Sequence, residues 1–185
     1  MSDPLYRKEL LRLAADAAGA GHLAHADGAA TAHNPACGDR VTMEVQVERG
    51  RITGLAHQTE ACVLTQASAA ILGAHAGGLD RIALKALADH VAAMLNGGDA
   101  PPAPYTDYGV FDGVAGHKGR HVCVLLPLKA ALEALEASEA SADAQPPRPL
   151  YISLALVTIL LTSPYFCASS APIQKLRSVS ATTFS

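Results

Sequence analysis

Residues 40–58 read RVTMEVQVERGRITGLAHQ and predict a β-hairpin. Apolar and polar residues alternate strictly from Val41 to Glu48, which is the period of a strand with one buried face. Arg49 and Gly50 then provide a turn, and residues 51–58 return as a second strand. The hairpin predicts an antiparallel sheet with one face in water. The sheet could include a third strand in addition to these two.

The segment before the hairpin predicts one helix and a stretch without regular structure. Ser2 or Asp3 can cap the helix, with Pro4 in its first position. Residues 17–32 are rich in Gly, Ala and His and are predicted to be irregular.

The segment after the hairpin has the apolar spacing of helices. Helices are predicted at about residues 63–76 and 79–96, each ended by a Gly-Gly pair. A Pro- and Gly-rich connection follows over residues 99–119. Three of its aromatic residues are predicted to fill the core beneath it: Tyr105, Tyr108 and Phe111.

A last helix is predicted from Cys123 or Val124 to about Ala137. Its start is inferred from Pro127, because proline fits a helix best in the first turn. The predicted fold class is therefore α+β, a small antiparallel β-sheet packed on one side by several α-helices.

The composition excludes several classes of protein. Half of the 185 residues are hydrophobic, and 14 Lys and Arg against 17 Asp and Glu give a net charge of −3. This balance argues against a nucleic-acid partner, which needs a basic excess, and against intrinsic disorder. The charged first 13 residues lack the apolar stretch of a secretory signal, so a cytoplasmic protein is expected.

The chain is predicted to divide into a domain at 1–137, a linker at 138–149 and an apolar tail at 150–185. The most apolar part of the tail, Leu150–Leu161, is 12 residues long, whereas a membrane-spanning helix needs about 20. A disordered or loosely packed tail is therefore favoured over an added strand or helix, and over a membrane contact.

Four cysteines are present, and no two form a CxxC pair. Cys37 is predicted in a loop, and Cys62 and Cys123 at helix starts, where the helix dipole favours a thiolate. Asp39 follows Cys37 by two residues, so three sulfurs and one oxygen could surround zinc or an iron–sulfur cluster. Spacing alone leaves open that these cysteines are buried apolar residues. Cys167 lies in the predicted tail and is assigned no role.

Three blocks of sequence carry a resemblance to a known family. Residues 33–42, HNPACGDRVT, resemble the NPxCGD signature of the IscU/SufU/NifU N-terminal family of iron–sulfur cluster assembly scaffolds. Residues 60–70, EACVLTQASAA, are similar to its second block, although Ala61 replaces the usual glycine. Residues 119–130, GRHVCVLLPLKA, are similar to its closing block.

The closing block is more similar to the SufU branch than to the IscU branch. Val122 stands where the IscU branch has a histidine directly before the third cysteine. Arg120, three residues before Cys123, and the long gap after Cys62 are both features of the SufU branch.

The resemblance implies a scaffold, a binding protein more than an enzyme. It would accept sulfur from a cysteine desulfurase and pass a transient iron–sulfur cluster to recipient apo-proteins. The implied ligands of iron or of the cluster are Cys37, Asp39, Cys62 and Cys123. Cys37 or Cys123 would accept the sulfur, and Arg120 would steer the anionic persulfide. The alternative is a zinc-dependent sulfurtransferase of the SufU kind, with Zn²⁺ in the same site.

The histidines are weaker candidates. His33 and His121 lie near the cysteines and are alternative ligands, although an exposed position is favoured for both. The other six are predicted to lie at the surface: His22, His25, His57, His75, His90 and His117.

Overall fold

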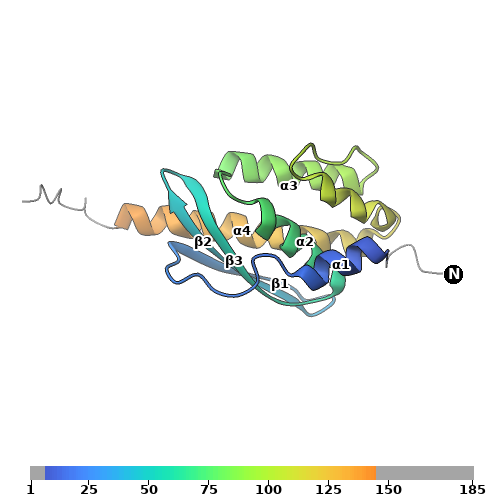
Figure 1. Cartoon of the computed structure of the whole chain (residues 1–185), viewed down its shortest axis with the longest axis horizontal. Coiled ribbons are helices and arrows are strands. Elements are labelled where there is room, and N and C mark those ends of the chain that lie inside the picture. The colour runs from blue at the N-terminus through green and yellow to red at the C-terminus, as the bar shows by residue number, and fades with distance from the viewer. Residues whose placement is uncertain (1–6, 145–185) are drawn as a thin grey trace, which may run out of the picture. The chain divides into compact units, whose positions relative to one another are not determined.

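The computed structural model describes residues 7–144 of the chain (Figure 1). The predicted cap at Ser2 or Asp3 and the predicted apolar tail at 150–185 lie outside these residues. Among residues 7–144, no helix combines the length and the apolar character needed to cross a membrane. The elements in chain order are α1 (Lys8–Asp16), β1 (Gly28–Asn34), β2 (Asp39–Glu48), β3 (Arg51–Glu60), α2 (Val63–His75), α3 (Arg81–Leu95), the 3₁₀ helix η1 (Thr106–Val114) and α4 (Lys118–Ala144).

The sheet is antiparallel with the strand order β1-β2-β3. The predicted hairpin is confirmed as β2 and β3, and its turn places Arg49 and Gly50 at φ values of 53° and 75°. The prediction of an irregular segment at 17–32 is wrong for residues 28–32, which form most of β1. Their small side chains give little strand signal, and the strand forms because β2 pairs with it and α4 packs on it.

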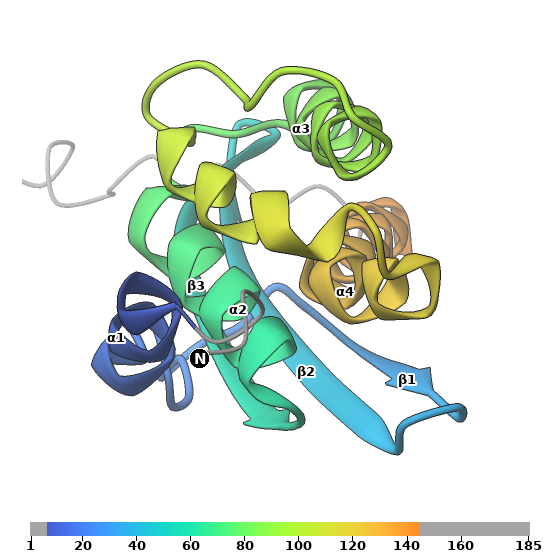
Figure 2. The same ribbon diagram turned by 90° about the vertical axis from the view of Figure 1, so that its right-hand side faces the viewer.

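The helices cover one face of the sheet, as predicted for the α+β class (Figure 2). Helix α4 lies along β1 and β2, and α2 packs between α4, β3 and α1. The core contains the inward residues of β2, with Val41, Met43 and Val45 fully buried. Tyr108 and Phe111 of η1 are also fully buried, which confirms their predicted place beneath the long connection.

Helix α4 is longer than predicted at both ends. It begins at Lys118 and continues to Ala144, so Pro127 lies inside it and Cys123 is not at its start. Proline has no N–H to donate to the carbonyl four residues earlier, which here belongs to Cys123. The hydroxyl of Thr65 in α2 reaches that carbonyl at 2.9 Å. A hydroxyl of α2 therefore lies within hydrogen-bond distance of the carbonyl that Pro127 leaves without its usual donor, a contact that sequence periodicity does not reveal.

His57 is buried, so its predicted surface position is wrong. Its Nε2 donates to the Ala18 carbonyl at 3.0 Å, and its Nδ1 lies 3.0 Å from the Thr59 hydroxyl. The imidazole thereby ties the segment after α1 to β3. Side chains alternate between the two faces of β3, and this alternation places His57 on the face that the helices cover. A polar ring can be buried there because the Ala18 carbonyl accepts its hydrogen bond.

Acid is expected to destabilise the wild-type protein more than the variant His57→Gln. Burial lowers the pKa of His57 below its ordinary value of 6.5, partly offset by the bond to Ala18. As the pH falls, His57 is therefore protonated in the unfolded chain before it is protonated in the folded protein. The contribution of neutral His57 to the free energy of unfolding is complete above about pH 6.5 and is lost as the pH falls below it. Urea midpoints at about pH 8 and about pH 5.5 measure the effect. The exposed-site variant His90→Gln should lose as much of its urea midpoint between the two pH values as the wild type does. An equal loss in His57→Gln would contradict the prediction.

Candidate metal centre

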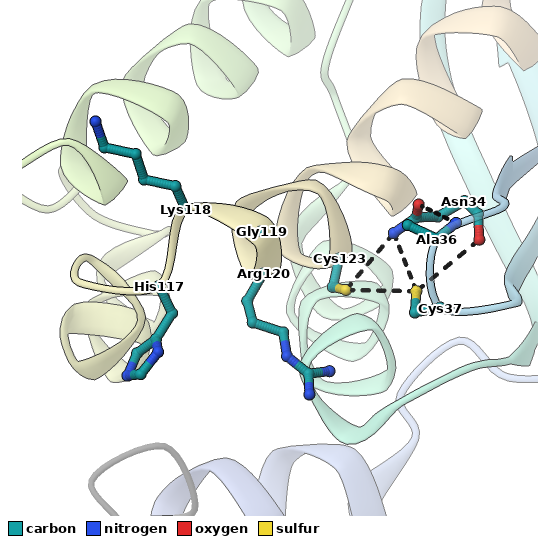
Figure 3. Close-up of a pocket in the computed structure, with 8 residues that line it drawn as sticks. All are labelled: Asn34, Ala36, Cys37, His117, Lys118, Gly119, Arg120 and Cys123. Carbon is teal, nitrogen blue, oxygen red and sulfur yellow. Dashed lines mark hydrogen bonds between the residues drawn. The ribbon is translucent and has the colours of Figure 1, made fainter.

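Three of the four predicted ligands meet at one end of the sheet. One ligand atom each from Cys37, Asp39 and Cys123 lies within 4.8 Å of the others. The two sulfur atoms are 3.7 Å apart and face each other from the β1–β2 turn and from α4 (Figure 3). Segments 86 residues apart in the chain are thus joined at one point.

Asn34 shapes the turn that carries Cys37. Its carbonyl accepts the Gly38 N–H at 2.9 Å, and its side-chain oxygen accepts the Ala36 N–H at 3.2 Å. Gly38 adopts a φ of 76°, a conformation that costs glycine little. The Asn34 amide nitrogen then donates to Cys37 Sγ at 3.0 Å and lies 3.8 Å from Cys123 Sγ.

Sequence reasoning did not assign Asn34 a role at the site. The Asn-Pro pair is a signal for a turn, and the amide of such a residue often bonds to the backbone two residues on. That signal predicts the turn, but not the donation to sulfur.

Asp39 is buried and joins β2 to the start of α2. Its Oδ1 accepts the Cys62 N–H at 2.9 Å, and its Oδ2 accepts the Thr65 hydroxyl at 2.6 Å. Burial acts to raise the pKa of Asp39, but hydrogen bonds from Thr65, from Cys62 and from Cys37 together hold it below its ordinary value. The carboxylate is therefore ionised at neutral pH and ready to face a cation.

Cys62 is the N-cap residue of α2, which confirms its predicted place at a helix start. It lies outside the group whose ligand atoms are mutually within 4.8 Å. Its Sγ is 3.6 Å from the Thr65 hydroxyl, which also bonds to Asp39. Its charge contributes to the raised pKa of Cys123, so the two thiols are close enough to interact.

Cys123 and Cys37 differ in exposure. Cys123 is only 1% exposed, and burial, with the charges of Cys62 and Asp39, raises the pKa of its thiol. Cys37 is exposed at the turn. In the metal-free protein Cys123 is therefore held as a thiol, while Cys37 is the sulfur that an incoming molecule can reach.

A pocket of about 380 Å³ opens beside the two sulfurs. Arg120 lies one helical turn before Cys123 and lines the same pocket (Figure 3). The full lining is Asn34, Ala36, Cys37, His117, Lys118, Gly119, Arg120 and Cys123. Two basic residues, Arg120 and Lys118, therefore line the pocket, although the Lys118 side chain points away from the two sulfurs (Figure 3).

The two histidines considered as alternative ligands are not part of the group of three. His33 is exposed on β1. His121 is half-buried, and its Nε2 lies 3.2 Å from the Ala115 carbonyl. His117, predicted at the surface, is exposed and lines the pocket.

The donor set is suited to zinc or iron. Thiolates select these metals, and a carboxylate supplies a harder oxygen ligand beside them. The buried Asp39 and Cys123 and the exposed Cys37 leave one side of the site open to the pocket. An open side is what a site needs if a metal or cluster is to enter and leave.

Comparisons with known proteins bear on the fold and the family of this chain. The family model for the NifU-like N terminal domain matches residues 5–110, which include Cys37, Asp39 and Cys62. A nitrogen-fixing NifU-like protein (N-terminal) from Brucella abortus is 32% identical, with a TM-score of 0.70 over 75% of this chain and 96% of that chain. A comparison with curated proteins found no match.

A further solved structure supports the fold. It is a protein from Fervidobacterium islandicum AW-1 described as an iron–sulfur cluster assembly scaffold for the SUF system. It has a TM-score of 0.65 at 22% identity, over 73% of this chain and 99% of that chain. The match of the family model over more than half the chain, with the Brucella structure, confirms the resemblance: this chain belongs to the NifU-like N-terminal domain family.

Proposed function

We propose that this protein is an iron–sulfur cluster assembly scaffold of the cytoplasm. It accepts sulfur from a cysteine desulfurase, holds iron or a nascent cluster, and passes the cluster to recipient apo-proteins. The observation that carries the proposal is the convergence of Cys37, Asp39 and Cys123 within 4.8 Å beside an open pocket.

Cys37 is the sulfur acceptor in this proposal. Its thiolate attacks the terminal sulfur of a persulfide on the desulfurase, and the bond between the two sulfurs of that persulfide breaks. Cys37 becomes the persulfide, and the desulfurase cysteine leaves as a thiolate, so no external oxidant or reductant is required. The exposure of Cys37 and the burial of Cys123 support this choice between the two predicted acceptors.

Arg120 steers the persulfide toward Cys37. A persulfide is anionic, and Arg120 lines the pocket through which it must approach. Lys118 lines the same pocket and adds to the attraction.

Iron or the cluster, as cargo, is held by Cys37, Asp39 and Cys123, with Cys62 as the fourth ligand. Cys62 is already bonded through its backbone N–H to Asp39. It is half-buried at the start of α2 and contributes to the environment of Cys123. A positive charge in the site offsets the burial and the neighbouring negative charges that hold Cys123 protonated, so the buried thiolate forms as the cargo binds.

The alternative function is a zinc-dependent sulfurtransferase that accelerates the desulfurase. The local sequence favours it, since Val122 replaces the histidine of the IscU branch and Arg120 stands as in the SufU branch. In that case Zn²⁺ occupies the same ligands, and Cys37 leaves the metal to accept sulfur.

Metal and acid-labile sulfide analysis of the anaerobically isolated full chain separates the two functions. A scaffold supplied with Fe²⁺, cysteine and a desulfurase should gain visible charge-transfer absorption together with labile sulfide. Tightly bound zinc, no labile sulfide and faster desulfurase turnover would support the alternative. Reconstitution without iron is the control, and a protein that retains neither metal nor sulfide would contradict both functions.

A further inference from the structure

The Thr65 hydroxyl lies between two ligand-bearing segments. It is fully buried in α2, with its oxygen 2.6 Å from Asp39 Oδ2 and 2.9 Å from the Cys123 carbonyl. One acceptor belongs to the side chain of a ligand, and the other to the backbone of a second ligand. Thr65 is therefore the direct link between the carboxylate and the helix segment that carries the buried thiol.

The Thr65 hydroxyl is within donating distance of both acceptors. Pro127 has no N–H, so the regular helix bond to the Cys123 carbonyl is missing. Asp39 Oδ2 accepts from Thr65, while the Cys62 N–H bonds to the other carboxylate oxygen. A buried acceptor that loses its donor carries a free-energy penalty.

A hydroxyl has one proton and can donate it to only one of these acceptors at a time. The shorter contact and the negative charge both favour Asp39, because hydrogen bonds to ionised groups are the stronger ones. In the metal-free protein the Thr65 hydroxyl therefore donates its hydrogen bond to Asp39, and its interaction with the Cys123 carbonyl is weaker.

We propose that Thr65 is a positioning residue that acts as a latch on Asp39. When Asp39 Oδ2 turns to bind cargo, the Thr65 hydroxyl rotates and donates its hydrogen bond to the Cys123 carbonyl, which fixes the α4 segment at that ligand. When cargo leaves, the Thr65 hydroxyl again donates its hydrogen bond to the Asp39 carboxylate and stabilises the empty site. The latch favours release, and this inference rests on the proposed function because it assumes that Asp39 binds metal.

The latch predicts an unusual sign for a substitution in a binding site. Thr65→Val removes a bond to a charged acceptor from the metal-free state and a bond to a neutral carbonyl from the loaded state. The metal-free state loses more, so Thr65→Val should bind Zn²⁺ about tenfold more tightly than the wild type. It should also unfold at lower urea, because a buried donor is gone.

Matched variants separate the latch from packing. Thr65→Ser keeps the hydroxyl and should restore the wild-type Zn²⁺ affinity. Ser68→Ala removes the neighbouring hydroxyl, which bonds to the Val124 carbonyl at 2.6 Å and not to Asp39. It should lower stability while leaving the affinity unchanged. Competition with a chromophoric chelator, using the full chain, measures all four proteins, and equal or weaker binding by Thr65→Val would overturn the latch.

A second measurement, by NMR, does not depend on whether a Thr65 variant folds. The carbonyl ¹³C signal of Cys123 should move when Zn²⁺ is added to the wild type, because the carbonyl then accepts the hydrogen bond from Thr65. In metal-free Asp39→Asn, the amide can donate to Thr65, so the hydroxyl proton is already directed to Cys123. That variant should show a shift of the same sign without metal, and an unmoved signal would overturn the inference.

The two proposals can fail separately. A wild-type protein that binds neither zinc nor iron would count against the proposed function. The comparison of metal-free wild type with metal-free Asp39→Asn would still decide whether the Thr65 hydroxyl can change its hydrogen-bond acceptor from residue 39 to the Cys123 carbonyl.

Discussion

Cys37→Ala is expected to abolish the transfer of sulfur from a cysteine desulfurase to this protein. The attacking group must be an ionised and accessible thiol. Cys37 is exposed beside the pocket, whereas Cys123 is 1% exposed and burial raises its pKa. Incubation with a desulfurase and ³⁵S-cysteine, followed by non-reducing gels and peptide mass spectrometry, measures the sulfur bound to each cysteine.

Cys123→Ala is the matched variant for this experiment. It should still accept sulfur on Cys37, although it should hold iron or zinc poorly. Labelled sulfur on Cys123 in the Cys37→Ala protein would show that the buried thiol is the acceptor, and would contradict the assignment.

Gly28→Ala is expected to have a large effect on stability although it lies outside the site. A Cβ atom on Gly28 would lie 2.1 Å from the Ala134 carbonyl oxygen and 2.7 Å from the Ser138 nitrogen. Both are backbone atoms of α4, so a rotamer change cannot relieve the clash, and β1 must move away from the helix. We expect a loss of about 3 kcal/mol or more in the free energy of unfolding, at the upper end of overpacking effects.

Urea unfolding followed by far-ultraviolet circular dichroism measures this loss. Gly77→Ala is the matched control, because a Cβ atom there meets nothing within 4 Å and its φ lies outside the range reserved for glycine. It should change the stability little. A Gly28→Ala protein as stable as the wild type would mean that β1 does not pack on α4 this closely.

The hairpin was predictable because its signal is local. Alternation from Val41 to Glu48 and the Arg49-Gly50 turn define two paired strands without any knowledge of the rest of the chain. The same holds for Cys62, since the end of β3 and the start of α2 are both readable from neighbouring residues.

The missed features depend on contacts between distant segments. Strand β1 consists mostly of small residues and becomes a strand through β2 and α4. Pro127 was expected to mark the first turn of a helix, but α4 continues through it, and the Thr65 hydroxyl of α2 lies 2.9 Å from the carbonyl that the proline leaves without its usual donor. The rule that proline fits best in the first turn describes an isolated helix. In this protein, contacts from another helix accompany a proline in the interior of α4.

The sequence predicted which residues would converge better than it predicted the residues that support them. Cys37, Asp39, Cys62 and Cys123 were expected together, and the structure brings three of them within 4.8 Å of one another, with Cys62 outside that group. Asn34 and Thr65 contribute through single hydrogen bonds to these ligands. Asparagine and threonine are common in loops and helices, so only the geometry distinguishes these two from other polar residues.

The convergence of the β1–β2 turn and α4 on one point has a consequence for the lifetime of the protein. An ion held there fastens segments that are far apart in the chain, and the unfolded chain has no such site. At a free concentration one hundred times its dissociation constant, an ion adds about 2.7 kcal/mol to stability. Proteases act on transiently opened chains, so the empty form would be degraded sooner than the occupied one. The amount of this protein in a cell would then follow the supply of the metal it carries.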